Sequence, residues 1–316
     1  MKAVSSILPD KQIIDGVKSA FPAIEFEFFK GISEAIPSLK EAEIFITFGE
    51  DLTDEIILEC KKLRWIMVMS AGLERMPLNL CEDRGILVTN ARGIHKVPMA
   101  EFTLGIMLHH VKQMGTLLSQ QQDQNWNRKI PMGELYGKTL LILGVGAIGG
   151  EIARLGKALQ MKTIGVNRHG GKVDSSDLVV TLEDFEEALP EADFIVSVLP
   201  STAETRYLLT EDHFQRMKKT AAFINIGRGD VVAEEVLISA MERSEIAHAY
   251  LDVFINEPLP SDHKFWTMSN ITVTPHISSI TKNYLPRSFE IFHHNLHTYI
   301  NNQSNFINKI EPGRGY

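Results

Sequence analysis

The first 95 or so residues alternate between short apolar runs and amphipathic stretches, the pattern of a parallel sheet covered by helices. Helical spacing of apolar residues predicts helices at 11–20 and 54–62. The apolar runs predict strands at 3–8, 25–29, 44–48, 65–69 and 87–89. This part of the chain therefore resembles a flavodoxin-like sheet.

A long connecting helix is predicted next, because apolar residues recur at helical spacing from Phe102 to Val111. The polar stretch 120–125 predicts an exposed loop or helix end, with Trp126 as its one large apolar residue. A second α/β unit opens at Lys138, and a helix at 287–300 closes the chain. Short apolar runs predict strands, buried on both faces, at 139–143, 163–166, 194–198, 222–226, 249–253 and 271–273.

Length, charge and the lack of long apolar runs limit the classes of protein to which this chain can belong. A chain of 316 residues suits two domains. With a net charge of −8 and no long run of Lys or Arg, nucleic-acid binding is not expected. We expect no membrane span and a cytoplasmic protein, because no signal peptide or long apolar run is found. Cys60 and Cys81 are expected to be reduced and packed.

The strongest local signal is Gly144-Val-Gly146-Ala-Ile-Gly149, between the strand at 139–143 and a helical run at 150–159. The first glycine permits a tight turn, and the second lets the backbone approach a pyrophosphate. The third lets helix and strand pack closely. The N–H groups at the helix start, including those of Ala147 and Ile148, would then face the phosphates. This order of elements predicts a dinucleotide site.

The residue that would contact the adenosine ribose lies at the end of the next strand, where the sequence reads Asn167-Arg168-His169. An acid there would repel a 2′-phosphate. Asn167 removes this repulsion, and Arg168 supplies a bidentate cation. The sequence therefore favours NADP, with NAD possible, although Arg168 read alone could be a solvated surface charge.

Three further segments each follow a predicted strand, and they contain Arg228, Glu257 and His276. The carboxyl ends of parallel strands line the ligand crevice, so the three can converge beside the cofactor. Singly, each has an ordinary explanation: an ion-paired loop arginine, a solvated acid, and a hydrogen-bonded core histidine.

Together these motifs resemble the D-isomer-specific 2-hydroxyacid dehydrogenase family over nearly the whole chain. The matching segments are the glycine turn at 144–149, Val198-Leu199-Pro200 with Thr205, Asn225-Ile226-Gly227-Arg228-Gly229, Leu251-Asp252-Val-Phe, Glu257-Pro258 and Pro275-His276. The resemblance implies two doubly wound parallel-sheet α/β domains with an active-site cleft between them. Residues 1–96 with 285–316 would form the substrate-binding domain, and 97–284 the Rossmann dinucleotide-binding domain.

The resemblance also assigns roles. Arg228 would hold the substrate carboxylate and polarise the carbonyl, and His276 would be the proton donor. Glu257 would orient the imidazole and favour its charged form. The turn at Ala71 and Gly72 would bind the substrate carboxylate. The further cofactor contacts would be Leu199, Pro200, Thr205, Ile226, Gly227 and Asp252, the last of which could equally cap a neighbouring segment.

The implied reaction is NADPH-dependent reduction of a short 2-oxo acid, such as glyoxylate or hydroxypyruvate, by a homodimer without a metal. Oxidation of phosphite or of another D-2-hydroxy acid is an alternative, as is a non-enzymatic dinucleotide-sensing scaffold. Asn167 departs from the acid of NAD-using relatives, and Glu257 from the glutamine of formate dehydrogenases. No regulatory domain follows the closing helix, and this argues against the allosteric phosphoglycerate dehydrogenases that carry one.

Overall fold

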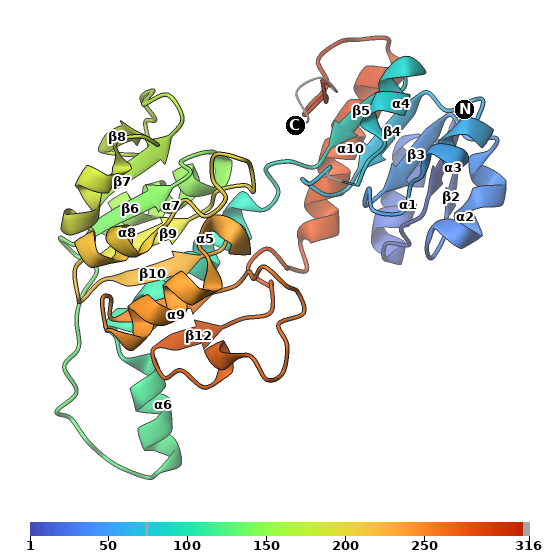
Figure 1. Cartoon of the computed structure of the whole chain (residues 1–316). Coiled ribbons are helices and arrows are strands. Elements are labelled where there is room, and N and C mark those ends of the chain that lie inside the picture. Colours follow the sequence, from blue (N-terminus) through green and yellow to red (C-terminus); the bar gives the residue numbers. More distant parts are fainter. Residues whose placement is uncertain (74, 312–316) are drawn as a thin grey trace. The chain divides into compact units, whose positions relative to one another are not determined.

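The computed structural model describes residues 1–73 and 75–311, and the chain divides into two compact units (Figure 1). Unit 1 comprises Met1–Ile94 and Thr281–Tyr316, and unit 2 comprises His95–Ile280. Each unit is built around one sheet in which all neighbouring strands are parallel. The predicted fold class, two parallel-sheet α/β domains, is confirmed.

The sheet of unit 1 has the strand order β2-β1-β3-β4-β5, the flavodoxin-like order expected for this part of the chain. Its strands are β1 (Lys2–Ser5), β2 (Glu25–Phe28), β3 (Ile44–Thr47), β4 (Trp65–Val68) and β5 (Leu87–Asn90). Its helices are α1 (Lys11–Ala20), α2 (Ile32–Leu39), α3 (Asp54–Glu59), α4 (Leu78–Asp83) and α10 (Tyr284–Ile300).

The closing helix α10 belongs to the core of unit 1 although it lies far along the chain from β4. Phe292 and Tyr299 stack on the buried ring of Trp65, each with a centroid distance of 5.4 Å. The indole N–H of Trp65 donates to Thr89 in β5 at 3.0 Å. Cys60 and Cys81 are both buried and free in this unit, as predicted.

The sheet of unit 2 has the order β12-β11-β10-β9-β6-β7-β8, a doubly wound order extended by one strand. Its strands are β6 (Thr139–Leu143), β7 (Lys162–Asn167), β8 (Leu178–Thr181), β9 (Phe194–Ser197), β10 (Ala222–Asn225), β11 (His248–Leu251) and β12 (Ile271–Val273). Its α-helices are α5 (Lys96–Val111), α6 (Met114–Gln122), α7 (Ala147–Ala158), α8 (Glu211–Arg216) and α9 (Glu234–Glu242).

Helices cover both faces of this sheet. Helices α5 and α7 contribute apolar side chains to one core, whereas α8 and α9 contribute to the core on the other face. Three short 3-10 helices, η1 (Phe185–Glu191), η2 (Gly229–Val231) and η3 (Lys264–Trp266), complete the unit. Strands β6, β9 and β10, in the middle of the sheet, are buried at every position, as expected for strands covered on both faces.

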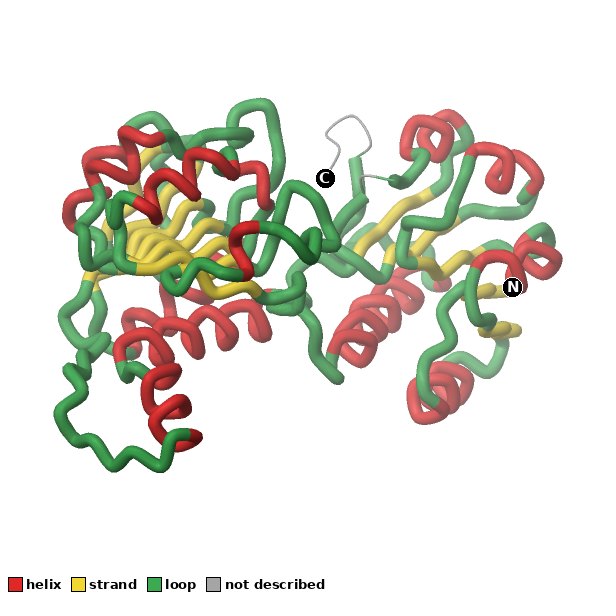
Figure 2. The backbone as a smooth tube through the Cα atoms, turned by 60° about the horizontal axis from the view of Figure 1, so that its bottom comes forward, coloured by secondary structure: helices red, strands yellow, loops and turns green. Residues whose placement is uncertain are grey.

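Helix α6 and the segment 123–135 project from the rest of unit 2 (Figure 2). The helix ends at Gln122, as the polar stretch predicted, and it contains no buried residue. The side chain of Trp126, just beyond it, is 91% exposed. Across the described residues, none of the helices has both the length and the apolar character needed to cross a membrane.

Candidate active site

The predicted cofactor-binding and catalytic segments follow strands of unit 2 at the carboxyl edge of its sheet. Strand register places the residues at the strand ends side by side, in the order Val273, Leu251, Asn225, Ser197, Leu143 and Val166. The glycine turn and the segments of Arg228, Glu257 and His276 follow these ends directly. Ligands of such sheets bind at this carboxyl edge.

The turn after β6 has the close contacts that its glycines predict. Gly144 has a φ of 98°, a conformation that favours glycine, and its N–H donates to Val166 at 3.1 Å. A Cβ atom on Gly149 would lie 2.2 Å from the carbonyl oxygen of Gly144, so no side chain fits there. The turn and α7 therefore pack together only with glycine at position 149.

Gly146, in contrast, borders open space. It is the N-cap of α7 and makes no side-chain capping bond, and a Cβ atom on it would meet no other described residue within 4 Å. The first N–H groups of a helix have no helical partners and attract anions. Gly146, Ala147 and Ile148 thus form a cradle that fits the pyrophosphate of a dinucleotide.

The end of β7 carries the two residues that were predicted to choose the cofactor. The Asn167 amide holds a local turn: Oδ1 accepts from the N–H of His169 at 3.0 Å, and Nδ2 donates to the carbonyl oxygen of Gly171 at 2.9 Å. Arg168 is half exposed, and its Nη2 lies 2.9 Å from Oε2 of Glu204. The cation predicted for a 2′-phosphate therefore already has a carboxylate partner.

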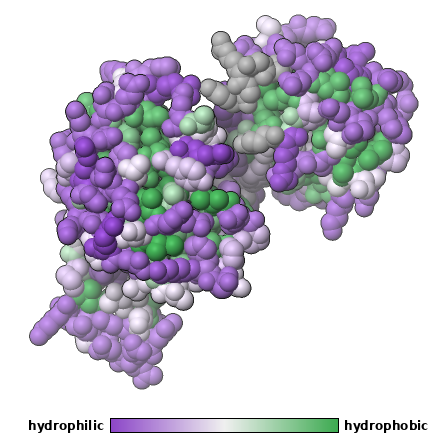
Figure 3. Space-filling model, viewed as in Figure 1, coloured by the Kyte–Doolittle hydropathy of each residue, from purple (hydrophilic) through white to green (hydrophobic). Residues whose placement is uncertain are grey.

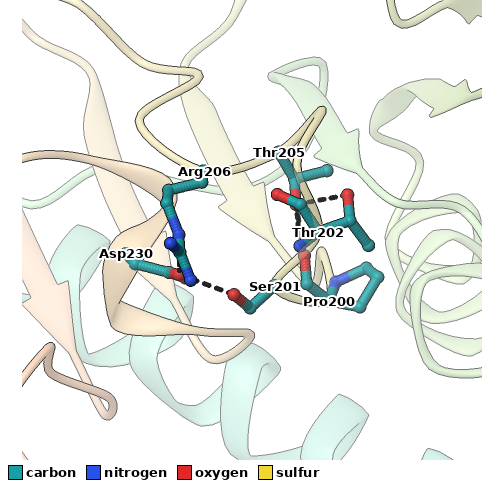
Figure 4. A network of polar contacts seen from close by, with 6 residues as sticks. All are labelled: Pro200, Ser201, Thr202, Thr205, Arg206 and Asp230. Carbon is teal, nitrogen blue, oxygen red and sulfur yellow. Dashed lines mark hydrogen bonds and ion pairs between the residues drawn. The ribbon is translucent and has the colours of Figure 1, made fainter.

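The loop after β9, which contains Pro200 and Thr205, closes on itself (Figure 4). The Thr205 hydroxyl donates to the carbonyl oxygen of Pro200 at 2.5 Å and accepts from the N–H of Thr202 at 2.9 Å. The Thr205 N–H also donates to the carbonyl oxygen of Thr202 at 3.2 Å. These bonds fix the backbone of the loop.

Gly227 lies against the backbone of Leu199, at the start of this loop. Leu199 and Ile226 are buried, and a Cβ atom on Gly227 would lie 2.7 Å from the carbonyl oxygen of Leu199. Only glycine permits so close an approach. The segments after β9 and β10 are therefore in direct contact.

Asp230 ties the same loop to the segment that carries Arg228. Ser201 donates to its Oδ2 at 2.5 Å, and Nε of Arg206 lies 3.2 Å from that oxygen (Figure 4). The N–H of Tyr207 donates to the backbone carbonyl of Asp230 at 2.7 Å. The loop is thus anchored two residues beyond Arg228.

His276 and Glu257 are hydrogen-bonded to each other. Nδ1 of His276 lies 2.8 Å from Oε2 of Glu257, and Oε1 of Glu257 accepts from the N–H of Phe254 at 2.9 Å. The side chains of His276 and Glu257 are 46% and 36% exposed, so the imidazole remains accessible. Since Nδ1 faces the carboxylate, Nε2 is the nitrogen that can exchange a proton with a substrate.

Asp252 holds the segment that contains His276. Its carboxylate is almost fully buried and accepts the N–H groups of Ile277 and Ser278, each at 2.9 Å, and the hydroxyl of Thr274 at 2.6 Å. The backbone N–H of His276 donates to the carbonyl oxygen of Asp252 at 2.8 Å. His276 has a φ of 50°, which is rare outside glycine, and these bonds impose it. The observed contacts of Asp252 are therefore those of a residue that caps a neighbouring segment, which was one of the two roles that the sequence left open.

Arg228 is linked to the other two segments through a close backbone contact. Its Nη1 donates to the carbonyl oxygen of Gly227 at 2.8 Å. A Cβ atom on Gly229 would lie 2.1 Å from the carbonyl carbon of Phe254, whose N–H holds Glu257. The three predicted catalytic segments therefore form one contiguous group in unit 2.

The predicted carboxylate-binding turn, Ala71 and Gly72, lies in unit 1 after β4. The carbonyl oxygens of both residues accept hydrogen bonds, from Asn90 Nδ2 at 2.8 Å and from the Ser70 hydroxyl at 3.0 Å respectively. With the carbonyl groups used internally, the N–H groups are the part of the turn suited to an anion.

Sequence reasoning missed the residues that position the others. Thr274, Ser278 and Glu204 are ordinary polar residues in the sequence, and only their distant partners give them a role. Thr274 did carry a weak signal, because it directly precedes Pro275 and His276. Within 1–73 and 75–311, no group of three or more His, Cys, Asp or Glu residues is arranged to hold a metal ion.

Comparison with known proteins places this arrangement in a family. The family model described as "D-isomer specific 2-hydroxyacid dehydrogenase, NAD binding domain" matches residues 104–278. The chain belongs to the D-isomer-specific 2-hydroxyacid dehydrogenase family. The resemblance first seen in the motifs is thereby confirmed.

Relatives in the 2-hydroxyacid dehydrogenase family differ in substrate. D-3-phosphoglycerate dehydrogenase of Methanocaldococcus jannaschii is 31% identical over 88% of this chain, which spans 54% of that relative, about half its length. Glyoxylate reductase of Aeropyrum pernix is 33% identical, with 77% of this chain and 75% of the relative covered. A solved structure of a family protein from Aeromonas salmonicida is 32% identical, covers 98% of this chain and 99% of its own, and has a TM-score of 0.87.

Proposed function

We propose that this protein reduces a short 2-oxo acid, such as glyoxylate or hydroxypyruvate, to the D-2-hydroxy acid, with NADPH as the preferred cofactor. The observation that carries the proposal is the His276–Glu257 pair at 2.8 Å, on the same sheet edge as the glycine turn. A proton donor and a dinucleotide cradle on one edge are what carbonyl reduction requires.

His276 is the proposed acid. Reduction places negative charge on the carbonyl oxygen, and a protonated imidazole can deliver its proton there from Nε2. Glu257 fixes the ring through Nδ1, because its own carboxylate is held by the N–H of Phe254. Asp252 sets the backbone from which the ring projects.

Arg228 is proposed to hold the substrate carboxylate and to polarise the carbonyl. A guanidinium offers a planar fork of donors that matches a carboxylate, which an ammonium group does not. The guanidinium would act on the substrate before and during reduction, so it would contribute to binding as well as to rate. In unit 1, the N–H groups of Ala71 and Gly72 are proposed to bind a carboxylate.

The residues present fit a nicotinamide dinucleotide. Gly144, Gly146 and Gly149 shape the turn for the pyrophosphate, and Ala147 and Ile148 contribute N–H groups. When bound, the dinucleotide supplies the hydride. We propose Leu199, Pro200, Thr205, Ile226, Gly227 and Asp252 as further residues that line its site.

The preference for NADP rests on the end of β7. Asn167 carries no charge that would repel a 2′-phosphate, and Arg168 provides a cation beside it. Both amide atoms of Asn167 are used in the local turn, so its contribution is the absence of an acid. NAD remains compatible with the same turn.

The proposal of a short substrate is supported by the relative named glyoxylate reductase, because the match to this chain covers 75% of that relative's length. The test is to mix purified protein with NADPH or NADH and a panel of 2-oxo acids, and to follow the loss of nicotinamide absorbance. The panel contains glyoxylate, hydroxypyruvate, pyruvate and 3-phosphohydroxypyruvate. Turnover of the first two with NADPH is expected; turnover of the phosphorylated acid alone, or of none, contradicts the proposal.

We also propose that the protein is a homodimer built through the projection at α6. Its exposed apolar side chains include Met114, Leu118, Trp126 and Met132. In Figure 3 hydrophobic residues interrupt the mostly hydrophilic surface of this projection. Large exposed apolar side chains in one segment are typical of an interface. Light scattering coupled to size exclusion should give the mass of two chains, and Trp126→Ala should shift it toward one; a monomeric wild type would contradict this.

A further inference from the structure

The Arg168–Glu204 ion pair spans the glycine turn. Arg168 follows β7 and Glu204 follows β9, and these strands flank β6 on its two sides. The pair, with 2.9 Å between Nη2 and Oε2, thus joins the two sides of the turn after β6. No other part of the proposed mechanism uses this contact.

Glu204 sits on a fixed backbone. It lies inside the turn closed by Thr202 and Thr205, and the loop is anchored to Asp230 through Ser201 (Figure 4). The carboxylate can therefore leave Arg168 by a change of side-chain rotamer, whereas its backbone stays in place. A 2′-phosphate that approached Arg168 would meet this acid.

The two cofactors differ in how they would meet the pair. A phosphate monoester carries close to two negative charges, and it would have to displace the Glu204 carboxylate from Arg168 and remain beside it. A ribose 2′-hydroxyl carries no charge and can donate a hydrogen bond to a carboxylate. The cation favours NADP, and its carboxylate partner opposes it.

We propose that Glu204 is a specificity-determining residue that weakens the binding of NADPH and supports that of NADH. This inference rests on the proposed function, because it takes the glycine turn to be the dinucleotide site. The protein accordingly discriminates less between the two cofactors than Asn167 and Arg168 alone would predict.

The test is equilibrium binding of NADPH and NADH to the purified full chain, followed by nicotinamide fluorescence without any 2-oxo acid. Glu204→Gln removes the charge and keeps the shape. NADPH should bind about fivefold tighter and NADH about twofold weaker, the range of exposed charge interactions. Glu204→Ala is a second variant, for which the same direction is expected with NADPH.

A matched control is Glu191→Gln. Glu191 forms an equally exposed ion pair with Lys162, at 2.5 Å, at the start of β7 on the opposite edge of the sheet. The net charge changes by the same amount, so an effect of overall charge would appear in both variants. Both dissociation constants should stay at the wild-type values in this control.

The inference is overturned if Glu204→Gln and Glu204→Ala leave the ratio of the NADPH and NADH dissociation constants unchanged, or if Glu191→Gln changes it equally. The proposed function fails separately. If the ratio shifts but the protein reduces no 2-oxo acid, the role of Glu204 is supported and the proposed reaction is refuted. If the protein reduces a 2-oxo acid but the ratio does not shift, the reaction is supported and the role of Glu204 is refuted. If neither dinucleotide binds the wild type, both fall.

Discussion

His276 Nδ1 lies 2.8 Å from Oε2 of Glu257, and the second oxygen of that carboxylate is held by the backbone of Phe254. A histidine that is oriented through Nδ1 by a fixed acid presents Nε2 for proton transfer. The imidazole remains accessible, at 46% exposure. Such a pair serves an acid catalyst better than it serves a structural core.

His276→Gln should therefore lower kcat for 2-oxo acid reduction by about 10²- to 10⁴-fold, the usual contribution of a positioned acid. Glu257→Gln should lower kcat by about tenfold or more, because the charged acceptor that orients the imidazole is lost and the ring is held less firmly. Steady-state kinetics at saturating NADPH measures both.

The matched control for these variants is His263→Gln. His263 also faces a glutamate, with Nε2 lying 3.3 Å from Glu234, but it caps η3 and belongs to none of the three predicted catalytic segments. Its loss should leave kcat within about twofold of wild type. Equal kcat in the His276 variant and the wild type would falsify the acid assignment.

Asp252→Asn should weaken both the fold and the reaction. The buried carboxylate accepts two N–H groups and one hydroxyl, and an amide nitrogen in place of one oxygen would face a donor. We expect a loss of about 1–3 kcal/mol in the free energy of unfolding in urea, the cost of an unsatisfied buried group. The kcat should fall as well, because the left-handed backbone of His276 depends on these bonds.

Thr274→Val is the comparison variant, since it removes the hydroxyl donor to Asp252 and leaves the carboxylate in place. It should cost about 1 kcal/mol and retain more activity than Asp252→Asn. A stable and fully active Asp252→Asn protein would show that the capping bonds do not position His276.

Strands and long helices could be predicted because the local spacing of apolar residues indicates which positions are buried. The runs at 139–143 and 271–273 coincide with β6 and β12, and the prediction at 11–20 coincides with α1. Strand β8 was missed because it lies at the sheet edge and none of its residues is buried. Helices α8 and α9 were missed because short or polar-rich stretches give little periodic signal.

The site was predictable where chemistry resides in a motif. The glycine turn and the segments of Arg228, Glu257 and His276 could be located because each follows a strand end. The partners of these residues were not predictable, because the carboxylate beside Arg168 comes from the loop after β9 and the sequence left the role of Asp252 open. Such contacts depend on the tertiary fold and not on local pattern.

Two glycines of the turn should affect different properties: Gly149 the stability of the protein, and Gly146 the binding of the cofactor. Gly149→Ala should destabilise the protein by about 2–3 kcal/mol, because the added Cβ would lie 2.2 Å from the Gly144 carbonyl oxygen and the backbone must shift. Gly146→Ala should leave the unfolding midpoint nearly unchanged, since its Cβ would meet no described residue within 4 Å.

NADPH binding, unlike stability, should be sensitive to a substitution at Gly146. If the open space there receives the pyrophosphate, Gly146→Ala should raise the dissociation constant of NADPH by about tenfold or more, roughly 1.4 kcal/mol. Gly105→Ala is the control, as Gly105 too borders open space and lies in α5, outside the glycine turn and the segment of Asn167. Unchanged NADPH binding by the Gly146 variant would place the pyrophosphate elsewhere.

Two histidines and a tyrosine of unit 2, His248, His110 and Tyr250, lie close together. His248 in β11 lies with its ring 4.4 Å from Tyr250 and 6.2 Å from His110. Burial, with smaller repulsion from His110 and His109, lowers the pKa of His248 to about 4. Burial also lowers the pKa of His110, and nearby Lys138 contributes.

The folded and unfolded states of the protein take up a proton on His248 at different pH values. The pKa of His248 falls from its ordinary 6.5 to about 4 on folding, so the unfolded chain is protonated first as the pH falls. Its neutral burial carries no penalty above pH 6.5, and stability is lost progressively between pH 6.5 and about pH 4. After allowance for partial solvent access, the loss is on the order of 2 kcal/mol.

His248→Gln isolates this effect, because glutamine can keep a hydrogen bond to Thr272, which His248 Nε2 contacts at 2.9 Å. Urea unfolding should show a variant similar to wild type near neutral pH, but relatively more stable by about 2 kcal/mol near pH 4.5. The exposed His297→Gln should track wild type at both. If His248→Gln lost stability as steeply as wild type, the acid sensitivity would have to arise from the lowered pKa of His110 instead.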